Sequence, residues 1–238
     1  MFFEPQSLIW RWIIMSERIS TGNHELDTLL DGGFLRNSMI LLAGNPGAGK
    51  TILSSSFIYD GALHDEPGVY ACFAETRKKL IQDMKKFEID FEPLIRRRKL
   101  EVLDLSIGSE TDVQSALNQI FETITTLRAK RLVVDSIAAM AMGLETDFEK
   151  RHLIRLLYRL ILKTGCTTIA ITDIPWNSNR IGESIEEFVV DGIILVEHFY
   201  DETENLKRQL RITKMRGTNH SRKTHKYSIN EKGLQIEI

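Results

Sequence analysis

In Ser38-Met-Ile-Leu-Leu-Ala-Gly-Asn-Pro-Gly-Ala-Gly-Lys-Thr51, a short apolar segment runs directly into a glycine-rich turn, and this combination is the strongest indication of the fold. Gly44 to Thr51 match the spacing G-x-x-x-x-G-K-[ST] at every fixed position. Glycines at these positions let successive backbone N–H groups turn inward around a phosphate, which also meets the positive end of the following helix. A buried strand before the turn and a helix after it are the required context, so we interpret the stretch as a phosphate-binding loop and not as a chance glycine turn.

The motif assigns phosphate binding to a continuous run of residues: Gly44, Asn45, Pro46, Gly47, Ala48, Gly49, Lys50, Thr51 and Ile52. The Lys50 ammonium is expected to reach the β- and γ-phosphates, and the Thr51 hydroxyl to bind Mg²⁺. The sequence therefore predicts a site for a nucleotide phosphate chain together with a magnesium ion.

Asp135 is the candidate acidic partner of that metal ion. It ends the apolar run that begins at Arg131, so its carboxylate should emerge at the same sheet edge as the phosphate loop. An aspartate at the end of a strand is also a common helix cap. With the phosphate loop upstream, we favour Thr51 and Asp135 as the residues that bind the metal.

The composition fits a single α/β unit inside the cell. A chain of 238 residues with 42% hydrophobic residues can bury one sizeable core. The net charge of −2 excludes a global attraction to nucleic acid or to an anionic membrane, although a local basic face remains possible. Cys72 and Cys166 lie in apolar runs without metal-ligand spacing, which suits a reduced, cytoplasmic protein.

Strand patterns alternate with helix patterns from residue 19 to residue 173, and two strand pairs follow. Continuous apolar runs at 68–74, 131–136 and 167–172 are typical of parallel strands covered on both faces. We therefore predict an α/β fold with a mostly parallel central sheet flanked by helices and with antiparallel C-terminal strands. The domain is expected to span residues 15–238.

Two segments leave alternatives open. Residues 1–14 are apolar and aromatic, too short to span a bilayer and without the features of a signal peptide. They are either a surface or partner anchor or an upstream extension before a natural start at Met15, which we favour. The basic run at 96–99 lacks interleaved aromatic residues, so a solvated helix end is favoured over a nucleic-acid contact.

Over residues 19–238 the sequence resembles a single-domain KaiC-like ATPase of the RecA superfamily, of archaeal type. Besides the phosphate loop, the resemblance depends on these motifs: Ile-Ser-Thr-Gly at 19–22, Gly-Gly at 32–33, Val-Val-Asp-Ser at 133–136, Glu-Phe-Val-Val-Asp-Gly at 187–192 and Lys-Met-Arg-Gly-Thr-Asn-His at 214–220. It implies an α/β RecA-like core and a homo-oligomeric ring, usually a hexamer, with ATP and Mg²⁺ between neighbouring subunits. It also implies that Lys214, Arg216 and His220 contact the γ-phosphate bound to the adjacent subunit, where cations stabilise the transferred phosphoryl group. The alternative is that these residues form an ordinary basic surface turn.

Glu75 is the candidate base that orients and deprotonates the attacking water, because it follows the apolar strand at 68–74. KaiC-like domains commonly carry two adjacent glutamates at this position, whereas this chain has Ala74-Glu75. This departure favours slow ATP hydrolysis or a nucleotide-locked switch.

The leading expectation is an oligomeric Mg-ATPase of signalling or regulatory type. One alternative is a RecA or RadA paralogue that binds single-stranded DNA, against which the balanced charge and the lack of a recognisable N-terminal DNA-binding domain argue. Another is a non-hydrolysing ATP-binding accessory ring, such as an archaellum component. The sequence does not identify a protein partner.

Overall fold

A computed structural model describes residues 18–105, 110–144, 146–175 and 189–238, so the extension predicted at 1–14 lies outside the described residues. The described residues form a nine-stranded sheet in the order β11-β10-β9-β8-β3-β7-β6-β4-β5. From β8 to β5 in that order, neighbouring strands are parallel. The parallel strands are β3 (Met39–Gly44), β4 (Gly68–Cys72), β5 (Leu100–Asp104), β6 (Arg131–Asp135), β7 (Thr167–Asp173) and β8 (Gly192–Tyr200). The predicted α/β fold with a mostly parallel sheet is confirmed.

The strand β3 shows why these apolar runs form a covered sheet. All of its residues are buried. Ile40 and Leu42 pack into the hydrophobic core on one face of the sheet, whereas Leu41 and Ala43 pack into the core on the other. Successive side chains of a strand point to opposite faces, so a continuous apolar run is what a strand between two helical layers requires.

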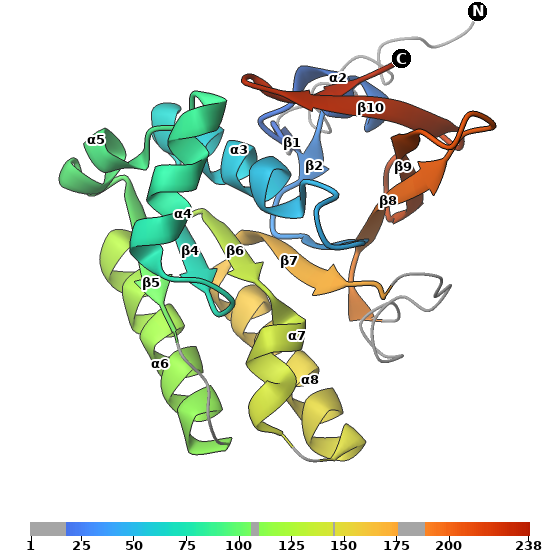
Figure 1. Cartoon of the computed structure of the whole chain (residues 1–238). Helices are drawn as coiled ribbons and strands as arrows, with labels where there is room; N and C mark the ends of the chain where they lie inside the picture. Colours follow the sequence, from blue (N-terminus) through green and yellow to red (C-terminus); the bar gives the residue numbers. More distant parts are fainter. Residues whose placement is uncertain (1–17, 106–109, 145, 176–188) are drawn as a thin grey trace, which may run out of the picture.

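Helices cover both faces of the sheet (Figure 1). The first core receives side chains from α2 (His24–Leu29), α3 (Lys50–Leu63), α4 (Arg77–Met84) and α5 (Phe91–Arg96). The second core receives side chains from α6 (Glu110–Leu127), α7 (Ile137–Met140) and α8 (Asp147–Thr164). Thr146 and Glu149 form a capping box at the start of α8, and Gly165 ends this helix in the left-handed conformation.

The C-terminal strands extend the sheet as antiparallel neighbours, as predicted from their two hairpin patterns. They are β9 (Leu206–Met215), β10 (Thr224–Asn230) and β11 (Gly233–Ile236). A separate two-stranded sheet joins β1 (Arg18–Ile19) to β2 (Phe34–Leu35). The strands β10 and β11 place the end of the chain beside the phosphate loop.

The helix α4 is shorter than the amphipathic sequence pattern on which it forms. The basic amphipathic run at 78–87 forms α4 only as far as Met84, and a 3₁₀ turn, η1 (Lys85–Phe87), follows. Glu88 adopts a left-handed conformation with φ of 58°, and the Ile89 N–H bonds back to the Met84 carbonyl. This closure stops the helix. A second 3₁₀ turn, η2 (Ala141–Gly143), lies between α7 and α8.

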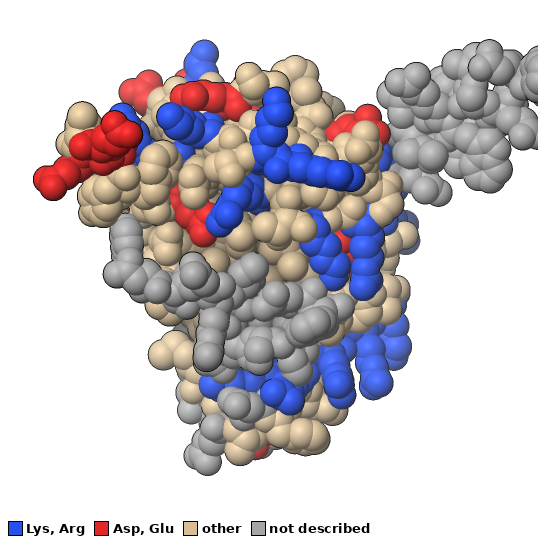
Figure 2. All heavy atoms as spheres, turned by 90° about the vertical axis from the view of Figure 1, so that its right-hand side faces the viewer, with Lys and Arg blue, Asp and Glu red and all other residues tan. Residues whose placement is uncertain are grey.

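Among the described residues, we find no helix that is both long enough and apolar enough to span a bilayer. The side of the molecule shown in Figure 2 carries many Lys and Arg side chains, and in its lower half most of the charged side chains are basic. The net charge of −2 therefore hides an uneven distribution of charge over the surface.

Candidate functional site

The phosphate loop connects the end of β3 at Gly44 to the start of α3 at Lys50. Gly49 precedes this helix with φ of 89°, a conformation that side chains rarely adopt. A Cβ atom on Gly44 would clash with the Val196 carbonyl oxygen, and one on Gly49 would lie 2.8 Å from the Ile229 Cδ1 atom. The loop therefore needs glycine at both positions because strands from the end of the chain pack closely against it.

Lys50 is buried and points back into the loop. Its Nζ atom donates hydrogen bonds to the carbonyl oxygens of Gly44 at 2.8 Å and Asn45 at 2.9 Å. The same ammonium forms an ion pair of 2.9 Å with Asp173, whose side chain is 48% exposed. Asp173 ends β7 and pairs in register with Gly44. The lysine charge is thus held where the motif predicts the outer phosphates.

Thr51 and Asp135, the residues predicted to bind the metal, lie together although 84 positions separate them in the chain. The Thr51 hydroxyl donates to Asp135 Oδ2 at 3.1 Å, and the Tyr70 hydroxyl donates to the same oxygen at 2.7 Å. Burial raises the pKa of the Asp135 carboxyl, and the hydrogen bonds from Tyr70 and Thr51 partly offset this. The negative charges of Glu75 and Asp173 raise this pKa further. A nearby dication would favour the ionised form.

These groups line a cavity of about 330 Å³. Its lining comprises Pro46, Gly47, Gly49, Lys50, Thr51, Ile52, Ala74, Asp135, Ser136, Ile171 and Asp173. Among the described residues, no group of three or more His, Cys, Asp or Glu side chains could hold a metal ion alone. Mg²⁺ in nucleotide sites takes one or two carboxylates together with substrate phosphates. Thr51 and Asp135 therefore fit a magnesium ion that arrives with the nucleotide.

Glu75 lies just beyond β4, near the cavity. Its carboxylate forms an ion pair of 2.8 Å with Lys79 on α4, and Ala74 lines the cavity while Glu75 does not. Its charge nevertheless raises the pKa of the Asp135 carboxyl. Glu75 is thus close to the metal-binding pair, and its role as the base stays a prediction.

Lys214, Arg216 and His220 do not meet the phosphate loop of their own chain. Met215 pairs with Gly192, and Gly192 pairs with Ile40 near the start of β3. The phosphate loop follows the other end of β3, about 13 Å further along the strand at 3.3 Å per residue. Lys214 and Arg216 therefore lie at the opposite edge of the sheet from the loop.

Each of these three residues has a contact near that edge. Lys214 donates to the Val190 carbonyl at 2.6 Å, and Arg216 forms an ion pair of 3.3 Å with Asp191. A ring nitrogen of His220 lies 2.8 Å from the Ser221 carbonyl oxygen. Their predicted contact with a phosphate on an adjacent subunit remains a prediction.

Two residues that position the loop were missed by sequence reasoning. The Tyr227 hydroxyl donates to the Ala48 carbonyl at 2.6 Å, and the His198 N–H donates to Asn45 Oδ1 at 3.0 Å. Burial lowers the pKa of the His198 imidazole, and the nearby charges of Arg208 and Lys50 lower it further. These contacts link positions more than 150 residues apart, so no local sequence pattern predicts them.

Comparison with known proteins agrees with this geometry. The family model for the KaiC ATPase matches residues 19–238. A UPF0273 protein of Pyrococcus horikoshii is 32% identical over 237 residues, covering 93% of this chain and 94% of the relative. A UPF0273 protein of Thermotoga maritima is 30% identical, covering 93% of this chain and 96% of the relative.

The circadian clock oscillator protein KaiC of Thermostichus vulcanus is 31% identical over 92% of this chain, which spans 42% of that longer protein. Among solved structures, a KaiC-like protein from Pyrococcus horikoshii matches with a TM-score of 0.84 and 34% identity. That match covers 93% of this chain and 99% of the other. With its phosphate loop, its parallel sheet and these matches over most of its length, the chain belongs to the KaiC family.

Proposed function

We propose that this protein binds Mg-ATP and hydrolyses it slowly, as a cytoplasmic homo-oligomer whose nucleotide state regulates a partner. The observation that carries the proposal is the convergence of Lys50, Thr51 and Asp135 on one cavity at the carboxyl edge of the sheet. Ligands of open α/β sheets bind at this edge. The ATPase unit is proposed to span residues 15–238.

Each group has a proposed role in the reaction. The loop amides and Lys50 hold the phosphates, and the Thr51 hydroxyl and Asp135 hold the metal ion. Mg²⁺ neutralises charge on the β- and γ-phosphate oxygens when it is bound. Glu75 orients the attacking water and accepts its proton, for which its carboxylate has to leave Lys79.

A ring, usually of six subunits in this family, supplies the remaining charges in the proposal. Lys214 and Arg216 lie too far along the sheet to reach the phosphates of their own chain. A head-to-tail interface would bring them to the neighbouring site, where an arginine can stabilise charge on the transferred phosphoryl group. Hydrolysis would then depend on assembly.

The test is phosphate release with Mg-ATP by the wild type, Lys50→Ala and Glu75→Gln, combined with direct binding measurements. We expect slow turnover by the wild type, binding without turnover by Glu75→Gln, and neither by Lys50→Ala. Turnover by Glu75→Gln equal to that of the wild type would refute the role of the base.

The second candidate is an ATP-binding ring that does not hydrolyse its nucleotide. It is favoured by Ala74, which leaves a single acid at this position, and by the ion pair that holds Glu75 to Lys79. Tight Mg-ATP binding by the wild type with no phosphate release above background would select this function.

A further inference from the structure

The outer face of α8 carries a row of cations with no acidic residue among them. Arg151, Arg155, Arg159 and Lys163 are all exposed and follow one another at intervals of four residues. Such spacing places side chains one above another along a helix. Within the described part of the chain, none of these four side chains has an ion pair or a hydrogen bond. We call these four residues the α8 basic row.

The stability of α8 does not explain this row. Like charges four residues apart weaken a helix by about 0.2–0.5 kcal/mol per pair. The helix dipole favours cations only in the last turn, where Lys163 lies, and Arg151 lies near the positive end. An anionic partner would relieve the repulsion along the row.

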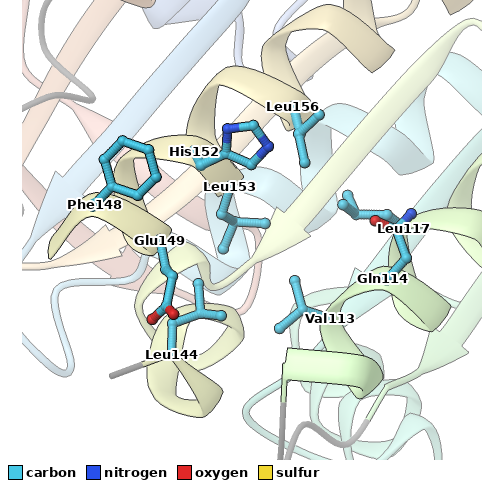
Figure 3. A pocket seen from close by; sticks show the side chains of 9 residues that line it. All are labelled: Val113, Gln114, Leu117, Leu144, Phe148, Glu149, His152, Leu153 and Leu156. Atoms are coloured by element: carbon cyan, nitrogen blue, oxygen red, sulfur yellow. The ribbon is translucent and has the colours of Figure 1, made fainter. Parts of the chain in front are cut away.

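A mostly apolar groove lies between α8 and α6 (Figure 3). Arg151 and Arg155 follow the groove residues Phe148 and His152 by three positions, so helical spacing places the α8 basic row beside the groove. Its volume is about 470 Å³, and it is lined by Val113, Gln114, Leu117, Leu144, Phe148, Glu149, His152, Leu153 and Leu156. Phe148 is 76% exposed at the rim, and its ring stacks on His152 with centroids 6.5 Å apart. Figure 3 shows Val113 and Leu117 on the α6 side of the groove and Leu153 and Leu156 on the α8 side.

The groove and the α8 basic row together favour a ligand that has both apolar and acidic groups. Leucine side chains fit a groove lined by leucine and valine, and carboxylates fit unpaired guanidinium groups at its edge. A nucleic acid would use the α8 basic row but leave the apolar groove empty. The chain's own segment at 1–17 is a poor match because it carries only two acidic residues, Glu4 and Glu17.

We propose that the groove between α6 and α8 binds an acidic amphipathic helix of a partner protein. The apolar face of that helix fills the groove, and its carboxylates pair with Arg151, Arg155 and Arg159. The helix-in-groove mode gives affinity through apolar anchors and specificity through the flanking charges. This inference does not depend on the nucleotide site, so its test is independent of the test of the proposed ATPase activity.

The test uses the full chain and a fluorescein-labelled peptide of about 18 residues, long enough for five helical turns. The peptide carries Leu at positions i, i+3, i+4 and i+7 and Glu on the flanks. A control peptide has the same composition in an order that mixes Leu and Glu around the helix. Fluorescence anisotropy gives the affinity of each peptide at low and high salt.

Two variants test the surface, and a third is the matched control. Arg155→Glu with Arg159→Glu reverses the α8 basic row, and Gln114→Trp places a large ring at the rim of the groove. Lys78→Glu with Arg97→Glu makes the same charge change on α4 and at the C-terminal end of α5, and both helices pack on the other face of the sheet. Circular dichroism and thermal unfolding check that every variant is folded.

We expect the wild type to bind the ordered peptide with a Kd of about 1–100 µM, and both surface variants to bind at least about tenfold more weakly. The control variant should bind within about twofold of the wild type, since rim charges act locally at moderate salt. The mixed-order peptide should not bind.

Four results would overturn the proposal. The first is equal binding of the two peptides, and the second is unchanged affinity after reversal of the α8 basic row. The third is tighter binding of a thymidine oligonucleotide or of anionic vesicles that the same reversal abolishes, which would assign the row to a polyanion. The fourth is a smaller particle mass of the Gln114→Trp variant in light scattering, which would assign the groove to a second copy of the chain.

Discussion

Lys50 places a positive charge inside the phosphate loop, where two carbonyl oxygens and Asp173 surround it. Replacing it with Ala removes the cation that should hold the outer phosphates. We expect Lys50→Ala to bind Mg-ATP at least about 100-fold more weakly, because charge-assisted bonds to phosphate are strong. Isothermal titration calorimetry measures this. Tight ATP binding by a folded Lys50→Ala protein would refute the assignment of the loop.

Asp135 is buried in the proposed metal site, so its charge is unfavourable in the protein without nucleotide. A raised pKa means that this carboxyl reduces stability once the pH has risen through that pKa. Asp135→Asn keeps an oxygen that can accept from Thr51 and Tyr70 but carries no charge. We expect the variant without nucleotide to be more stable at pH 7.5 by about 1 kcal/mol, or about 2–4 °C in Tm.

Urea and thermal unfolding over a range of pH test this prediction. The gain should shrink as the pH falls toward 4, where the wild-type carboxyl takes up its proton. Mg-dependent ATP binding should be lost in the same variant. Lower stability of Asp135→Asn than of the wild type at pH 7.5 would show that burial of the wild-type carboxylate does not reduce stability.

His198 has a lowered pKa because it is partly buried against the phosphate loop near Arg208 and Lys50. Its imidazole therefore takes up a proton at a lower pH in the folded protein than in the unfolded chain, where it does so near pH 6.5. Its contribution to stability is therefore present above pH 6.5 and is lost as the pH falls through the lowered pKa.

We expect NMR titration of the folded protein to give His198 a pKa below 6.5. We also expect His198→Gln to flatten the fall in stability between pH 6.5 and pH 5. A wild-type pKa at or above 6.5 in the protein without nucleotide would contradict the proposed effect of partial burial and nearby cations on this ring.

Among the secondary-structure elements, β10 packs against the phosphate loop and supports it. The Tyr227 hydroxyl bonds to the Ala48 carbonyl, and its burial raises the pKa of the phenol far above the physiological range, so it remains a donor. We expect Tyr227→Phe to cost about 1 kcal/mol of stability, because it leaves a loop carbonyl without its partner. Chemical denaturation measures this cost. Tyr200→Phe, at an exposed hairpin position, is the control and should change stability little.

The helices and strands were largely predictable from the sequence because their apolar patterns are local. The phosphate loop and the meeting of Thr51 with Asp135 were predictable too, because a motif and a strand end define them. The contacts that support the loop could not be predicted from the sequence. Asn45 bonds to His198, and Tyr227 to Ala48, across more than 150 residues, and such pairs follow only from the order of the strands.

Arg131 shows the same limit at the start of a strand. It is buried, forms an ion pair of 2.7 Å with Glu66, and its guanidinium lies 4.8 Å from the centre of the Phe57 ring. Because Arg131 precedes an apolar run, the sequence suggests that it lies at an exposed strand end. Only the packing of α3 against this strand shows that the Arg131 side chain is buried and contacts Phe57. Ion pairs of this kind depend on the tertiary structure.

At the scale of the whole molecule, the phosphate loop and the C-terminal cations lie at opposite edges of one sheet. The sequence could predict both groups, but only the strand register shows that a single chain cannot bring them together. The proposed head-to-tail ring would resolve this arrangement, because the same two edges would meet between neighbours. ATP bound by one subunit is therefore proposed to be hydrolysed with the help of the next.

Phosphate release by a mixture of Glu75→Gln with Arg216→Ala tests whether catalysis is shared between subunits. Each variant alone should be nearly inactive. In randomly mixed rings, about a quarter of the head-to-tail interfaces join an intact Glu75 to an intact Arg216. We predict that the mixture regains about that share of wild-type turnover. No recovery in rings shown to contain both variants would contradict catalysis shared between subunits.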